Sequence, residues 1–98
     1  MRYNKNMVAK NRYLIATRFG SFYARIVERK REGIFSVSIP AFSNVMTEGR
    51  TLTEAKKFAA EVIELQCHAA LDDHKLVIDD LRHAYGKYAR AGTFNVSA

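Results

Sequence analysis

Two alternating stretches in the first half of the chain predict a β-hairpin. Side chains from 22 to 27 alternate with the two-residue period of a strand. A second alternation runs from 34 to 39 and places Phe35, Val37 and Ile39 on one face. The pair Glu32-Gly33 between them predicts the turn, because glycine adopts positive φ without steric cost. Pro40 ends the second strand, since proline has no N–H for a ladder hydrogen bond.

A short strand at 45–47 and a long helix at 51–71 are predicted next. Thr51-Leu52-Thr53-Glu54 matches a capping box, in which the hydroxyl of the first residue and the carboxylate of the last satisfy each other's backbone N–H groups. Apolar positions then recur at three- and four-residue steps, which predicts one buried stripe against the sheet. The stripe comprises Leu52, Ala55, Phe58, Ala59, Val62, Leu65, Gln66 and Ala69.

The flanking segments are less sharply patterned. Residues 12–18 suit a strand, although a short helix fits them nearly as well. Residues 76–78 read as a further strand, and Asp79 or Asp80 as the cap of a last helix that would carry Leu81, Ala84, Tyr85 and Tyr88. We therefore expect an α+β fold: a three- to four-stranded antiparallel sheet on one main helix, in the order β-β-β-α-β. A basic N-terminal arm (1–18) would precede the core (19–78), and a short C-terminal helix and tail (79–98) would follow it.

Composition is typical of one small soluble domain. The chain has 98 residues, 48% of them hydrophobic and 27% charged. Its single cysteine, Cys67, excludes an intrachain disulfide. The N-terminus lacks the apolar stretch of a signal peptide, and no run approaches the roughly 18 apolar residues that a membrane span needs. A cytoplasmic protein without a membrane partner is expected. So small a core also favours a homo-oligomer, a dimer or higher.

The charge is unevenly distributed along the chain. Residues 1–31 contain nine basic residues and one acidic residue, a net charge of +8, whereas 32–98 contain seven basic and nine acidic residues, a net charge of −2. This asymmetry indicates either a DNA or RNA partner for the N-terminal third or simply a solvated basic arm. The sequence favours neither interpretation over the other. The candidate nucleic-acid contacts are Arg2, Lys5, Lys10, Arg12, Arg18 and Arg25.

Candidate chemistry is sparse. The acidic pairs Asp72-Asp73 and Asp79-Asp80 are the only clustered carboxylates and could hold Mg²⁺ in a nuclease, but a helix cap and solvated surface explain them more simply. The histidines and Cys67 lack the ligand spacing of a zinc site. We expect no catalytic residue, no metal and no cofactor. Tyr23 lies on the strand face opposite the apolar one, so Tyr23, Asp72 and Asp73 are the candidate contacts to a partner protein.

One ordered set of motifs resembles a known family. Gly33 to Pro40 is followed by Phe42, then by Thr47-Glu48-Gly49 and Thr51-Leu52-Thr53-Glu54-Ala55. This order resembles the HicB-like antitoxins, over about residues 22–78. The chain departs from the family pattern at Ala41, where an acidic residue is usual, and at Ser43-Asn44, where Pro-Gly is common. Residues 79–98 are also too few for the DNA-binding domain that many members append.

The resemblance implies a compact core related to a degenerate ribonuclease H fold, oligomerisation, and binding to a small ribonuclease toxin. The antitoxin would neutralise a basic toxin by covering it and would need no chemistry of its own; it could also regulate its own expression by binding DNA. The alternative hypothesis is a nucleic-acid-binding regulatory protein that uses the basic N-terminal third. The weakest is a metal-dependent nuclease built on Asp72 and Asp73.

Overall fold

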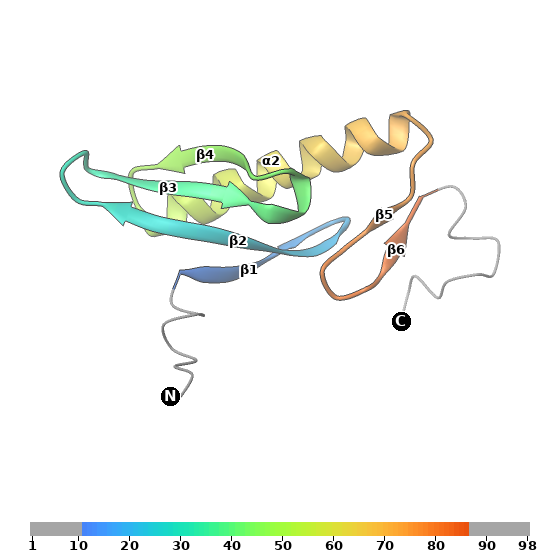
Figure 1. Cartoon of the computed structure of the whole chain (residues 1–98), viewed down its shortest axis with the longest axis horizontal. Coiled ribbons are helices and arrows are strands. Elements are labelled where there is room, and N and C mark those ends of the chain that lie inside the picture. The colour runs from blue at the N-terminus through green and yellow to red at the C-terminus, as the bar shows by residue number, and fades with distance from the viewer. Residues whose placement is uncertain (1–10, 87–98) are drawn as a thin grey trace.

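The structure is a computed structural model that describes residues 11–86. Its sheet contains β1 (Arg12–Thr17), β2 (Gly20–Arg29), β3 (Ile34–Ile39) and β4 (Val45–Gly49). A 3-10 turn, η1 (Pro40–Phe42), joins β3 to β4. The single α-helix of this part of the chain, α2 (Leu52–Asp72), follows β4, and two short strands, β5 (Val77–Ile78) and β6 (Ala84–Tyr85), come last (Figure 1).

The four strands pair with their neighbours in chain order, all antiparallel. The predicted turn at Gly33 is confirmed, because this glycine has a φ of 68°. Residues 12–17 form a strand, which decides between the two readings of that segment. The α+β class and the sheet on one main helix are confirmed. The fourth strand of the sheet is β1, however, whereas the strand predicted at 76–78 pairs only with β6.

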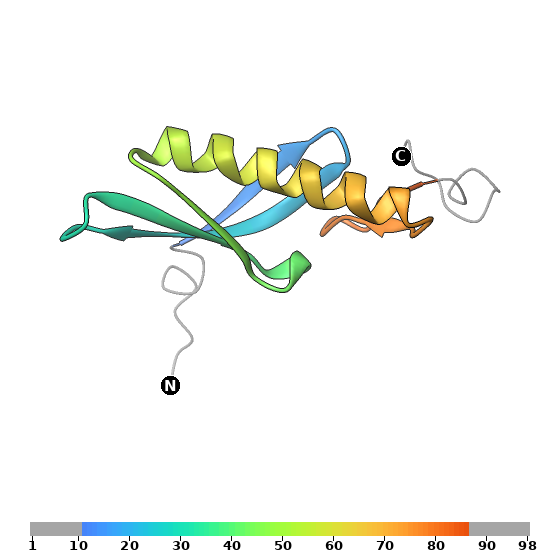
Figure 2. The same cartoon turned by 90° about the horizontal axis from the view of Figure 1, so that it is seen from above.

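Helix α2 lies across one face of the sheet and leaves the opposite face uncovered by any described segment (Figure 2). The sheet contributes buried side chains at Ile15, Phe22, Ala24, Ile26, Val37 and Ile39. The helix contributes buried side chains at Ala55, Ala59, Ile63 and Cys67. Two alanines at a four-residue spacing let the first half of the helix approach the strands closely, which fixes the line along which α2 crosses the sheet.

The buried stripe of α2 is rotated from the predicted one. Ala55 and Ala59 are buried as predicted, but Ile63 and Cys67 complete the stripe, whereas Leu65 is 66% exposed. The sequence carries two overlapping apolar stripes on this helix, and periodicity alone cannot say which one packs on the sheet. The unused stripe consists of Phe58, Val62, Leu65 and Ala69. Its first two residues are half-buried, and its last two are exposed.

The Thr51 half of the predicted capping box at the start of α2 is confirmed, whereas the Glu54 carboxylate has a different partner from the predicted one. The Glu54 N–H donates to Thr51 Oγ1 at 3.0 Å, and a Glu54 carboxylate oxygen accepts from the Arg50 N–H at 2.7 Å. The carboxylate thus reaches one residue further back than the motif predicts. The first contact satisfies an N–H group that the first turn of a helix leaves without a partner, and the second holds the residue that precedes the cap.

We expect Thr51→Ala to lower the free energy of unfolding by about 1 kcal/mol, because the cap is lost. For a domain of this size that corresponds to a fall in Tm of about 4–8 °C. Thr53→Ala is the matched control: Thr53 is exposed inside the first turn, so alanine there is neutral or slightly stabilising. Equal melting temperatures for the two variants would contradict the cap.

The helix predicted from Asp79 or Asp80 onward is wrong over residues 79–86. These residues form a turn and β6, and Ala84 and Tyr85 pair with Ile78 and Val77. The physical reason is that Asp79 accepts hydrogen bonds from another strand instead of capping a helix. Residues 87–98, which include Tyr88 and the predicted tail, lie outside the described residues, as do residues 1–10.

Candidate binding surfaces

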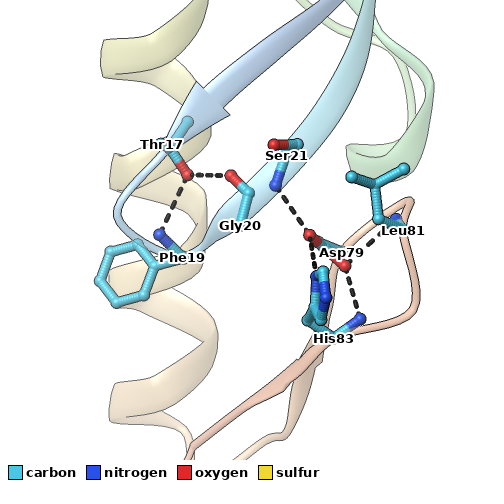
Figure 3. Close-up of polar contacts among 7 residues, drawn as sticks. All are labelled: Thr17, Phe19, Gly20, Ser21, Asp79, Leu81 and His83. Atoms are coloured by element: carbon cyan, nitrogen blue, oxygen red, sulfur yellow. Dashed lines mark hydrogen bonds and ion pairs between the residues drawn. The ribbon is translucent and has the colours of Figure 1, made fainter. Parts of the chain in front are cut away.

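The first residues of β2 have no partner in β3, because the pairing of the two strands ends at Arg25 and Ser38, just before Pro40. The turn between β5 and β6 takes over that edge (Figure 3). The Ser21 N–H donates to Asp79 Oδ2 at 2.8 Å, and the Tyr23 N–H donates to Asp80 Oδ2 at 2.7 Å. The Asp80 N–H donates in turn to the Ser21 carbonyl at 3.0 Å. The acidic pair is therefore a backbone clamp that attaches the β5–β6 hairpin to the sheet.

Asp79 is the buried charged residue of this region, with 3% of its surface exposed. Its carboxylate accepts from the backbone N–H groups of Ser21, Leu81 and His83 and contacts His83 Nδ1 at 3.3 Å. Burial alone would raise the pKa of this carboxyl, but the hydrogen bonds from Ser21 and His83 outweigh it and hold the pKa below its ordinary value. The carboxylate is thus ionised and has its acceptor positions filled.

A second feature lies on the open face of the sheet, away from α2. Arg12 of β1 and Arg25 of β2 are directly opposite each other in the register, and Tyr23 lies two residues from Arg25 on the same face. The Arg12 guanidinium carbon lies 4.0 Å from the centre of the Tyr23 ring. A cleft of about 680 Å³ opens here. We call it the arginine cleft; its lining is Asn11, Arg12, Tyr23, Ala24, Arg25, Pro40 and Asp80.

The other predicted nucleic-acid contacts do not join the arginine cleft. Arg18 lies in the β1–β2 turn and faces the helix, where its Nε is 3.6 Å from Glu64 Oε1 and its backbone N–H donates to Glu64 Oε2. Arg2, Lys5 and Lys10 fall outside the described residues. The structure thus brings together Arg12, Arg25 and Tyr23, three of the residues that the sequence singled out.

A third surface lies along the flank of α2 that faces away from β1. Two contacts mark the flank of α2 that faces β1 and the β1–β2 turn. Lys56 Nζ lies 4.9 Å from the centre of the Tyr13 ring, and the ring centres of His68 and Phe19 are 4.9 Å apart. At 100° per residue, the flank away from β1 carries the unused apolar stripe and acidic residues along its margin. We call this surface the acidic flank; it comprises Phe58, Glu61, Val62, Leu65, Ala69 and Asp72, with Asp73 at the end of the helix.

Of the predicted partner contacts, Asp72 and Asp73 lie on the acidic flank, whereas Tyr23 lies on the other side of the molecule in the arginine cleft. Both aspartates are exposed. They do not assemble a metal site with Asp79, whose carboxylate oxygens are already hydrogen-bonded. Within residues 11–86 no three His, Cys, Asp or Glu side chains are grouped so as to hold a metal ion.

Comparisons with protein-family models, with curated proteins and with solved structures gave no significant match to this chain. The binding surfaces must therefore be interpreted from their own chemistry.

The Cys67 thiol is not a reactive group. Burial, with a smaller contribution from Glu64, raises the pKa of the Cys67 thiol to about 11, so the thiol stays protonated and weakly nucleophilic. Cys67 is fully buried and packs as a small core residue. In the described part of the chain, no helix combines the length and apolar character that crossing a membrane requires.

Sequence reasoning missed two features of these surfaces. The role of Asp79 and Asp80 depends on contacts across nearly sixty residues, which no local pattern reveals. The acidic flank did leave a signal, because the helix has more apolar positions than one buried stripe needs. Counting the two stripes separately would have revealed the surplus.

Proposed function

We propose that this chain is a non-catalytic binding protein of the HicB-like antitoxin type, which neutralises a small basic ribonuclease toxin by covering it. The proposal is supported first by the order of strands, turn and capped helix over residues 22–78, on which the family resemblance rests. The observation that carries it furthest is the acidic flank. A 66% exposed leucine at the centre of an apolar stripe is a feature that a partner protein would bury.

The chemistry of the acidic flank suits a basic partner. Leu65, Val62 and Phe58 offer an apolar centre, and Glu61 and Asp72 border it with negative charge. An apolar centre with a charged rim is the usual anatomy of a protein interface, and opposite charge steers the encounter. A toxin that binds RNA carries positive charge on its RNA-binding face, so the acidic flank complements that face. Occlusion of this kind requires no catalytic residue in the antitoxin.

Co-expression tests this function. The chain is produced together with the small basic protein encoded next to it, with a tag on one of the two, and the eluate and cell growth are monitored. We expect the two chains to co-purify and the growth arrest caused by the basic protein to be relieved. If they never co-purify and no growth defect is rescued, the antitoxin function is wrong.

Two variants test whether the acidic flank is the surface that contacts the toxin. Leu65→Lys places a cation at the centre of the acidic flank, and we expect it to weaken toxin binding at least about tenfold, a change of about 1.4 kcal/mol. Leu81→Lys is the matched control, because Leu81 is 45% exposed on the β5–β6 turn, outside the acidic flank. Affinities from calorimetry decide between them, and equal losses would exclude the acidic flank as the interface.

Self-association is proposed separately. Strand β4 is at the edge of the sheet and carries Met46, whose side chain is 63% exposed. An unpaired strand edge next to exposed apolar side chains favours pairing with a second copy. Sedimentation of the free chain at several concentrations checks the oligomeric state, and a monomer throughout would contradict it.

A further inference from the structure

The two arginines of the arginine cleft are direct neighbours across two paired strands. Arg12 and Arg25 are cross-strand partners and both are exposed. Like charges directly opposite each other destabilise a sheet. Among the described residues the ion pairs are Arg18–Glu64, Arg29–Glu32 and His83–Asp79, so neither guanidinium of the pair is in an ion pair there. The Asp80 carboxylate lines the same cleft but is not within ion-pair distance of either arginine. An anion bound between the two cations would relieve this repulsion.

The cleft also holds one of these cations in place. Arg12 stacks on Tyr23, which itself is anchored because its backbone N–H donates to Asp80. A stacked guanidinium loses less conformational freedom on binding and keeps its edge N–H groups free for a bidentate contact, the geometry that favours phosphate oxygens. The anion site is therefore partly organised before any ligand arrives.

The shape of the arginine cleft selects among phosphate ligands. Its volume of about 680 Å³ is within the range of sites that enclose a small molecule or a few units of a chain. Pro40 at the end of β3 and Asp80 on the β5–β6 turn line it together with the strands, so the site is a walled depression and not a flat basic surface. In a single strand the bases are unpaired and can reach the apolar and aromatic lining of such a depression, whereas a duplex offers only its backbone there.

We propose that the arginine cleft binds the backbone of a single-stranded nucleic acid. A phosphodiester lies between the guanidinium groups of Arg12 and Arg25. The adjoining nucleoside packs against Pro40 and the edge of Tyr23, because unpaired bases bind aromatic and apolar side chains. The exposed Asp80 carboxylate accepts a hydrogen bond from a base amino group or a sugar hydroxyl. This site lies on the opposite face of the sheet from α2 and does not depend on the proposed antitoxin function.

The test uses the full chain and fluorescently labelled 12-nucleotide strands of RNA and of DNA, measured by anisotropy over a range of salt concentrations. For Arg12→Gln/Arg25→Gln we expect affinity to fall at least tenfold. The slope of log affinity against log salt should fall by about 0.7, the value for one lost phosphate contact on a single strand. Lys30→Gln/Arg31→Gln is the matched control: it removes the same charge from the exposed β2–β3 turn, and we expect less than a twofold loss.

Three results would overturn the proposal: equal losses in the two double variants, binding of a 12-base-pair duplex as tight as that of a single strand, or no salt-dependent binding by the unmodified chain. Stronger binding of RNA than of DNA would assign the Asp80 contact to the 2′-hydroxyl, and equal binding would assign it to a base. A melting temperature for Arg12→Gln/Arg25→Gln at or above that of the unmodified chain is expected, because repulsion is removed. A large decrease would instead give the arginines a structural role.

Discussion

Asp79→Ala is expected to lower the free energy of unfolding by about 4 kcal/mol. The substitution removes the acceptor of three backbone N–H groups and of His83 Nδ1 at a site with 3% exposure. Each buried donor left without a partner costs about 1–3 kcal/mol, and some of the four regain water when the turn relaxes. Urea unfolding, followed by circular dichroism, measures the loss.

Asp80→Ala is the comparison for this variant. Asp80 is exposed, and its side chain accepts one backbone hydrogen bond, so a loss of about 1 kcal/mol is expected. If the two alanine variants were equally stable, Asp79 would not be the residue that attaches the β5–β6 hairpin to the sheet.

The contribution of Asp79 depends on pH in a defined direction. Its pKa is lower in the folded chain than in the unfolded chain, so the ionised carboxylate stabilises the fold fully above the unfolded pKa of about 3.9. That stabilisation is lost as the pH falls through the lower, folded pKa. The stability difference between the unmodified chain and Asp79→Asn should therefore be constant from pH 7 to about 5 and narrow below about 4. If the stability difference grew on acidification, the pKa of Asp79 would not be lowered by folding.

Gly20→Ala is expected to destabilise the chain by about 3 kcal/mol or more. Gly20 follows the β1–β2 turn with a φ of 101°, a conformation that costs other residues about 1–3 kcal/mol. A Cβ atom there would also lie 2.6 Å from Asp79 Cβ and 2.7 Å from Asp79 Cγ. The turn cannot yield easily, since Thr17 Oγ1 donates to the Gly20 carbonyl at 2.7 Å and accepts from the Phe19 N–H at 3.1 Å.

Gly33→Ala separates the two causes of destabilisation, which are backbone strain and the collision with Asp79. Gly33 also has a positive φ, 68°, but a Cβ atom there meets nothing within 4 Å, so only the backbone strain of about 1 kcal/mol is expected. The excess loss in Gly20→Ala measures the collision with Asp79. Because Gly20→Ala displaces the Asp79 carboxylate that Asp79→Ala removes, Gly20→Ala/Asp79→Ala should cost less than the sum of the single variants. Additive losses in thermal unfolding would show that the two residues do not interact.

Local chemistry determined much of this protein from the sequence alone. The alternation in β2 and β3, the Gly33 turn, the stop at Pro40 and the cap at Thr51 depend on neighbours within a few residues, so the hairpin, the short strand and the start of α2 could be predicted. The same is true of the charge asymmetry and of Tyr23 and Arg25 sharing a strand face, because side chains two apart lie on the same side of a strand.

Tertiary structure decided the rest. Two apolar stripes on α2 satisfy the same periodicity, and only the close approach that Ala55 and Ala59 permit selects the one that packs on the sheet. The register of β1 with β2 places Arg12 beside Arg25, thirteen residues away, and thereby creates the arginine cleft. The start of β2 has no β3 partner beyond Pro40, so Asp79 accepts a hydrogen bond from the Ser21 N–H there and does not cap a helix. In each case the deciding contact joins residues far apart in the chain, where local pattern carries no information about pairing.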